Sequence, residues 1–137
     1  MKPLTRLIAL LVCGWASMGV LAAQLGDSPY RSELHRADLS GAPGMEVIAS
    51  IVRIKPGETA AAHSHHGIEA AYVIQGAMVQ YPGQAPRLLK TGTALFNLRD
   101  VVHSGFTVVG SRTLVIYTVH VVDKNKPLYQ PPAAPAH

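Results

Sequence analysis

The sequence predicts an all-β domain, built as an antiparallel sandwich or barrel. Short runs rich in β-branched residues follow one another at close spacing, and glycine and proline separate them. A chain of 137 residues is too short for two ordinary domains and long enough for one core. The expected strands are residues 46–54, 71–74, 77–81, 87–90, 93–96, 101–109 and 112–122.

The predicted domain spans residues 45–125, and segments without a strand pattern flank it. Residues 24–44 contain Ser28-Pro29 and Gly41-Ala42-Pro43-Gly44, so we expect an irregular arm that ends in a turn. Residues 126–137 are rich in proline and alanine, which cannot build a packed element. We therefore expect a flexible tail there.

Residues 1–23 have the pattern of a secretory signal peptide. Lys2 and Arg6 give a positive start, and an apolar run then reaches Leu21. The run is short for a spanning helix, so cleavage is favoured over an anchor and no membrane anchor is expected in the mature protein. Cys13 leaves with the signal, so the mature chain has no disulfide and no thiolate ligand. We expect a periplasmic or secreted protein.

Charge argues against a nucleic-acid partner. The whole chain has a net charge of +4, and without Lys2 and Arg6 ten basic and eight acidic side chains remain, a net charge of +2. The basic residues are scattered and form no cluster in the sequence. Nucleic-acid binding needs a concentrated basic patch or a recognisable reading module. A small-molecule ligand or substrate is the expected partner.

Two histidines and a glutamate in one short segment form a candidate metal site. His63 and His65 point to the same side of an extended strand, and Glu69 can return to that side after a turn relieved by Gly67. A further ligand must come from elsewhere in the fold. Imidazole nitrogens and a carboxylate suit one divalent transition metal ion, Fe, Mn, Ni, Cu or Zn, rather than calcium or magnesium.

The spacing of these residues resembles the first conserved motif of the cupin superfamily. Gly57, His63, His65, Glu69 and Gly76 occupy every specified position of that motif. The short gap between this motif and the next is similar to that of small single-domain bacterial cupins. His66 is the alternative to His65 if the register of the strand slips by one residue.

The second cupin motif is matched in part. Its leading glycine and its histidine are present as Gly92 and His103, whereas Leu98, Asp100 and Thr107 replace the usual proline, glycine and asparagine. Aspartate tolerates left-handed backbone geometry, so the turn before the histidine can still form.

The resemblance covers about residues 44–125 and implies a double-sheet jelly-roll barrel. It also implies a 3-His/1-Glu metal site, in which His103 is the fourth ligand beside His63, His65 and Glu69. Cupins often pair through sheet faces or edges, so the resemblance implies a homodimer as well.

Two function classes stay open from the sequence. One is a metal-dependent, oxygenase-like enzyme that acts on a small organic molecule, which the resemblance to small cupins implies. The other is a non-catalytic module that binds or senses a metal or small ligand. No acid or base for proton transfer stands in a recognisable motif, which favours oxygen chemistry among the enzyme functions and equally favours a module without catalysis. The candidates for that role are Glu46, Asp100, His66, His120 and the tyrosines, and for Asp100 a turn that bonds its own backbone is favoured.

The residues expected to surround the site come from a strand in residues 112–122 and from two aromatic candidates. In residues 112–122 the alternation puts Leu114, Ile116, Thr118 and His120 on one face, but both faces are largely apolar and the inward one is not identified. Tyr72 and Phe96 are candidates for a pocket wall, and ordinary core packing is an equally open alternative for each.

Overall fold

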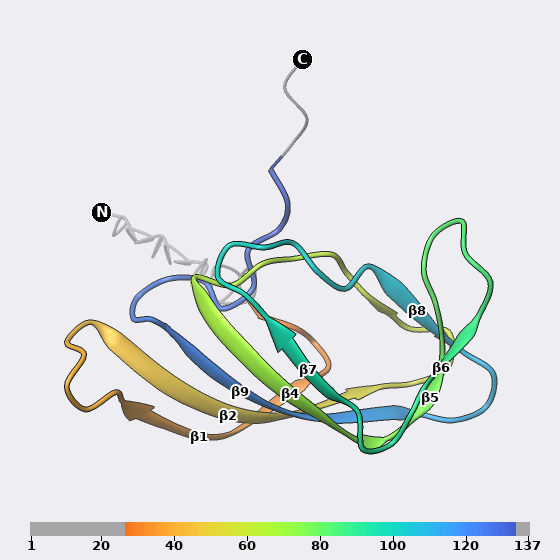
Figure 1. The fold of residues 1–137 in the computed structure, drawn as a ribbon, viewed down its shortest axis with the longest axis horizontal. Coiled ribbons are helices and arrows are strands. Elements are labelled where there is room, and N and C mark those ends of the chain that lie inside the picture. Colours follow the sequence, from red (N-terminus) through yellow and green to blue (C-terminus); the bar gives the residue numbers. More distant parts are fainter. Residues whose placement is uncertain (1–26, 134–137) are drawn as a thin grey trace, which may run out of the picture.

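Two antiparallel β-sheets form the protein in a computed structural model that describes residues 27–133 (Figure 1). The predicted signal peptide, residues 1–23, lies outside these described residues. Within 27–133, no helix is long and apolar enough to cross a membrane. The first sheet has the order β1 (Arg31–Asp38), β2 (Met45–Ile54), β9 (Leu114–Asp123), β4 (Gly67–Gln75) and β7 (Ala94–Asn97). The second has the order β3 (Thr59–Ala60), β8 (Phe106–Val109), β5 (Ala77–Gln80) and β6 (Arg87–Leu89).

The core lies between the two sheets and confirms the jelly-roll prediction. Period-two alternation buries one face of each long strand, because successive side chains of a strand point to opposite sides. In β9 the buried face is the one with Leu114, Ile116, Thr118 and His120. This inward face is apolar at one end and polar at the other. The main apolar cluster contains Val52, Ile54, Ala71, Val73, Ala77, Val79, Phe106, Val108, Leu114 and Ile116.

The expectation of an irregular arm over residues 24–44 is wrong for residues 31–38. They form β1, which pairs with β2 along its length at the edge of the first sheet (Figure 1). Most β1 side chains are exposed and polar on both faces, so the segment lacks the alternation by which strands are recognised. Backbone pairing and ion pairs hold it instead, including Arg36 Nη1 to Glu46 Oε1 at 2.6 Å.

The expected flexible tail, residues 126–137, is wrong for residues 128–130. Leu128 is buried against Ile48 and Val122, and Tyr129 packs beside them. Gln130 exchanges two backbone hydrogen bonds with Ser64, both of 2.9 Å. Two apolar residues between prolines are too short a signal to predict such packing. Residues 134–137 lie outside the described part of the chain.

Candidate metal centre

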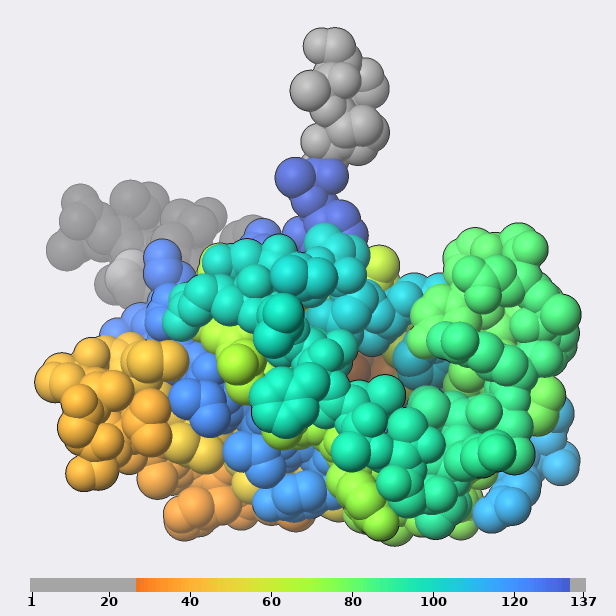
Figure 2. Space-filling view, in the orientation of Figure 1, coloured from red at the N-terminus to blue at the C-terminus, as the bar shows by residue number. Residues whose placement is uncertain are grey.

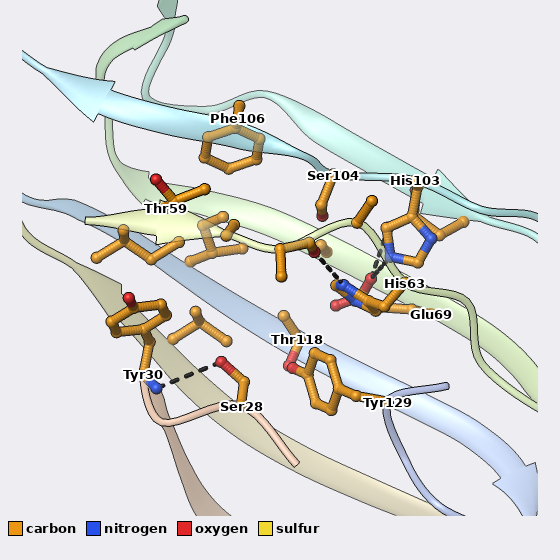
Figure 3. Close-up of a pocket in the computed structure, with 18 of the residues that line it drawn as sticks. Ser28, Tyr30, Thr59, His63, Glu69, His103, Ser104, Phe106, Thr118 and Tyr129 are labelled. Carbon is orange, nitrogen blue, oxygen red and sulfur yellow. Dashed lines mark hydrogen bonds and ion pairs between the residues drawn. The ribbon is translucent and has the colours of Figure 1, made fainter. Parts of the chain in front are cut away.

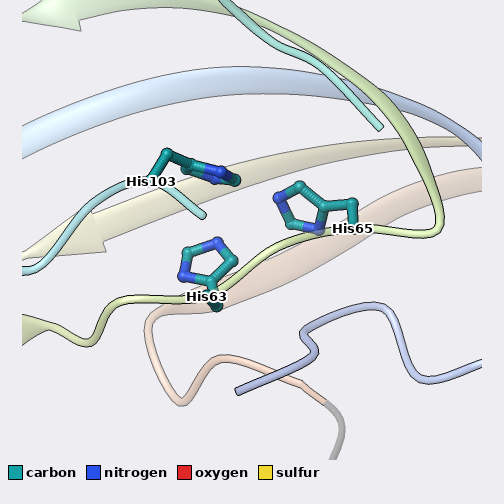
Figure 4. Close-up of side chains that lie close together, drawn as sticks. All are labelled: His63, His65 and His103. Carbon is teal, nitrogen blue, oxygen red and sulfur yellow. The ribbon is translucent and has the colours of Figure 1, made fainter. Parts of the chain in front are cut away.

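The structure brings the four predicted ligands together from three segments. His63 and His65 lie between β3 and β4, Glu69 is in β4, and His103 is in the loop between β7 and β8. His63 and His103 form an isolated bridge, with backbone hydrogen bonds of 3.1 and 2.8 Å. The three imidazoles face one another, with ring centroids 4.4 to 4.9 Å apart (Figure 4).

The turn before His103 forms without the proline and glycine of the second cupin motif. Asp100 takes the expected left-handed geometry, with φ of 60°, and its backbone N–H donates to His65 O at 2.9 Å. Its carboxylate bonds the Nδ1 of His66 at 3.2 Å rather than its own backbone. His66 therefore bonds the loop between β7 and β8, and His65 rather than His66 is the residue that joins the cluster.

Backbone carbonyls set the tautomer of the three histidines. In each ring Nδ1 donates a proton to a carbonyl oxygen, which leaves the Nε2 lone pair free for a ligand, as in metal-binding histidines generally. The hydrogen bond on Nδ1 also fixes the orientation of each ring. The bonds run from His63 to Ala61 at 2.8 Å, from His65 to Leu128 at 2.5 Å, and from His103 to Val101 at 3.2 Å.

The Glu69 carboxylate lies at the centre of the cluster. Oε2 is 3.4 Å from the Nε2 of both His65 and His103, and it accepts a hydrogen bond of 2.5 Å from Asn97 Nδ2. Oε1 is 3.4 Å from the Nε2 of His120. Because N–H···O hydrogen bonds measure about 2.7–3.2 Å, the three imidazoles are close to the carboxylate without bonding it well.

His120 is a member of the cluster that the sequence analysis did not include among the ligands. It lies directly opposite Glu69 in the β4–β9 pairing, and its side chain is fully buried. Among the described residues neither of its ring nitrogens has a hydrogen-bond partner. Alternation in residues 112–122 placed His120 on the same face as Thr118. The sequence did not show that this face points inward, so it did not assign His120 to the site.

The donor atoms of this cluster fit a divalent metal ion. The Nε2 atoms of His65, His103 and His120 are buried and unpaired in the described part of the chain, which costs about 1–3 kcal/mol for each such group. Two ligands on one tetrahedral ion, with bonds of about 2.1 Å, lie about 3.4 Å apart. Two groups of three residues approach this spacing, because within each group all donor atoms lie within 4.8 Å of one another. They are His63-His65-His103 and His65-Glu69-His120. These buried groups could hold a metal ion.

Burial and mutual contacts set the charges of the site. Burial alone would raise the pKa of Glu69, but contacts from His103 and His65 and the charge of His120 outweigh it and hold that pKa well below its usual range. Burial lowers the pKa of His63 and of His120 to about 4. At neutral pH the site therefore presents a carboxylate at Glu69 and neutral imidazoles at His63 and His120, which are the protonation states that bind a metal.

The metal-free protein should lose stability as the pH falls from about 6.5 to about 4. A histidine that titrates near 6.5 when unfolded and at about 4 when folded takes up its proton first in the unfolded chain. Glu69 adds a loss of the same sign at lower pH, below its unfolded pKa. Melting temperatures of EDTA-treated protein at pH 7.5, 5.5 and 4.5 measure the effect. A flat profile over this range would contradict it, and the His120→Gln variant should show a smaller fall.

A cavity of about 560 Å³ adjoins the cluster, within the size range of small-molecule sites. His63, Glu69 and His103 lie at one end of it, and Tyr30, Thr59 and Phe106 lie toward the other (Figure 3). The space-filling view shows a hollow in this face of the molecule (Figure 2). Tyr72 and Phe96, the candidates for its wall, point outward instead and are 52% and 68% exposed. Tyr81 and Tyr129 are the further aromatic lining residues.

Comparison with known proteins supports the resemblance drawn from the motifs. The model of the ChrR cupin-like domain family matches residues 21–122. A conserved protein with a double-stranded β-helix domain from Klebsiella pneumoniae is 17% identical, with a TM-score of 0.54 over 74% of this chain and 84% of that chain. The polyketide cyclase RemF from Streptomyces resistomycificus is 19% identical, with a TM-score of 0.50 over 69% and 76%. These two likenesses show the fold. A comparison with curated protein sequences gave no match.

Proposed function

We propose a metal-binding function for this chain, which belongs to the ChrR cupin-like domain family. In this proposal it is an exported protein that holds one divalent transition metal ion and binds a small organic molecule beside it. The proposed ligands are His63, His65, Glu69 and His103. The observation that carries the proposal is the set of buried Nε2 atoms that have no hydrogen-bond partner within residues 27–133 and lie 3.4 Å from the Glu69 carboxylate. His120, with the same separation from Glu69, supplies a further nitrogen to the cluster.

A bound ion of this kind supplies a Lewis acid, or a redox centre if the metal is iron, manganese or copper. The residues of the chain orient it and shape the space beside it. Asn97 donates to Glu69 and so holds the carboxylate in place. Burial raises the pKa of Tyr129 well above its usual value, so its hydroxyl stays protonated and is a donor rather than a base.

The cavity lining favours oxygen chemistry over proton transfer among enzyme functions. Its carboxylates in the described chain are Asp27 and Glu69. Asp27 accepts hydrogen bonds from Arg31, and Glu69 belongs to the His cluster, so neither is a free general base. Glu46 and Asp100, the other candidates with a carboxylate, do not line the cavity. Glu46 accepts a hydrogen bond from Arg36, and Asp100 bonds His66. Binding without turnover is the competing function, and metal-dependent oxygen uptake with a substrate distinguishes the two.

Protein purified from the periplasmic fraction tests the proposal directly. We expect elemental analysis to find one transition metal ion per chain, and mass spectrometry to find the mature chain without its first 22 or 23 residues. The His103→Ala variant should lose the ion, whereas His35→Ala, which changes an exposed histidine of β1, should keep it. Equal metal content in both variants, or none in the wild type after loading with Fe(II), Mn(II) or Zn(II), would refute the metal centre. An intact N-terminus would refute export.

A further inference from the structure

Arg87 is an exposed cationic side chain among the residues that line the cavity. Its guanidinium lies over the ring of Tyr81, 4.6 Å from the centroid, and both residues line the cavity. Arg31, Arg36 and Arg99 each form ion pairs with carboxylates. Within residues 27–133, Arg87 forms none.

The cavity lining therefore carries one cation, Arg87 of β6, that has no carboxylate partner within residues 27–133. Asp27 is neutralised by Arg31, and Glu69 lies with the histidines at the metal centre. The Tyr81 ring packs against Phe106, with centroids 5.6 Å apart, so the surface beneath the guanidinium is anchored in the core. Stacking on an aromatic ring restrains the guanidinium and leaves its N–H donors free.

Much of the cavity lining is apolar. It includes Val52, Ile54, Leu89, Leu95, Phe106 and Ile116. A ligand that packs against these side chains must have an apolar body, because polar groups buried there would find few partners. An unpaired arginine at the edge of such a cavity is suited to a planar anion, since its fork of donors matches a carboxylate.

We propose that the cavity takes an apolar carboxylate whose anionic group binds Arg87 while its hydrocarbon body extends toward the His/Glu cluster. This names the class of the small molecule in the proposed function and rests on it. Arg87 is a specificity-determining residue in this arrangement, because a neutral analogue of the same shape forfeits the ion pair. The metal ligands of the cluster are unaffected by its replacement.

Fluorescence titration with 2-naphthoate and with its uncharged amide, 2-naphthamide, tests the inference. The wild-type protein should bind the carboxylate more tightly than the amide. The Arg87→Met variant should bind 2-naphthoate about tenfold or more weakly, with 2-naphthamide changed less than about twofold. Arg53→Met is the matched control, because Arg53 is an exposed arginine of β2 outside the cavity lining and should leave both affinities unchanged.

Titrating metal-loaded and EDTA-treated protein separates this inference from the metal proposal. Loss of the carboxylate preference on metal removal, with the Arg87→Met variant like the wild type, would place the anion on the metal and overturn the role of Arg87. Failure of the wild type to bind either probe, or equal binding of both, would also overturn it. A wild type that binds no metal yet prefers 2-naphthoate through Arg87 would refute the metal centre and support the anion site. If Arg87→Met unfolds, Arg87→Gln gives the same comparison.

Discussion

Replacing His65 by alanine should abolish tight metal binding and loosen the C-terminal segment. His65 is fully buried, its Nε2 faces Glu69, and its Nδ1 donates to Leu128 O at 2.5 Å. Loss of a residue that only orients a ligand costs about 10–100-fold in metal affinity, so loss of a ligand should exceed about 100-fold. Calorimetric titration with Zn(II) or Co(II) absorption measures this.

The same variant should destabilise the metal-free protein. The carbonyl oxygen of Leu128 loses its hydrogen-bond donor and stays buried. The missing imidazole also leaves a cavity beside Tyr129. We expect a loss of about 2–3 kcal/mol in the free energy of unfolding. His35→Ala, on exposed β1, is the control and should change neither quantity appreciably. Unchanged metal affinity in His65→Ala would remove His65 from the ligand set.

Replacing Gly67 by alanine should damage both the sheet and the site. A Cβ at this position would lie 2.1 Å from Val121 O and 2.6 Å from Val122 Cα, and these backbone atoms cannot turn aside. Gly67 pairs with Val122 at the start of β4, two residues before Glu69. Separation of β4 from β9 at this point should cost roughly 3 kcal/mol of stability and displace the Glu69 carboxylate, weakening metal binding.

Gly83→Ala is the matched control for this prediction. Gly83 has φ of +70°, and among the described residues no atom lies within 4 Å of a Cβ built there. Its replacement should cost about 1 kcal/mol through backbone strain alone and leave metal affinity unchanged. Urea unfolding measures stability for both variants. A Gly67→Ala protein as stable as Gly83→Ala would contradict the close packing of β4 on β9.

The case of Gly67 also shows a prediction with the right residue and the wrong reason. The sequence analysis expected glycine there to relieve a turn before Glu69. In the structure Gly67 lacks the positive φ of the turn glycines, and it is the close approach of β9 that leaves no room for a side chain. A single sequence shows that glycine is present, but the neighbour that requires it comes from a strand more than fifty residues away.

Local spacing determined much of this protein. The alternation of strands and turns indicated the all-β fold, and the positions of His63, His65 and Glu69 predicted which side chains meet, because both depend on residues close in sequence. The second motif extended this to His103, whose turn forms as expected through Asp100.

Only the tertiary structure decided what the rest of the chain contributes. His120 reaches the cluster through its register with Glu69, β1 forms by pairing with β2, and Gln130 is held by Ser64. Arg87 and Leu89 bring β6 into the lining of the cavity. Each of these contacts joins segments far apart in sequence, and backbone pairing carries no side-chain pattern from which it could be predicted.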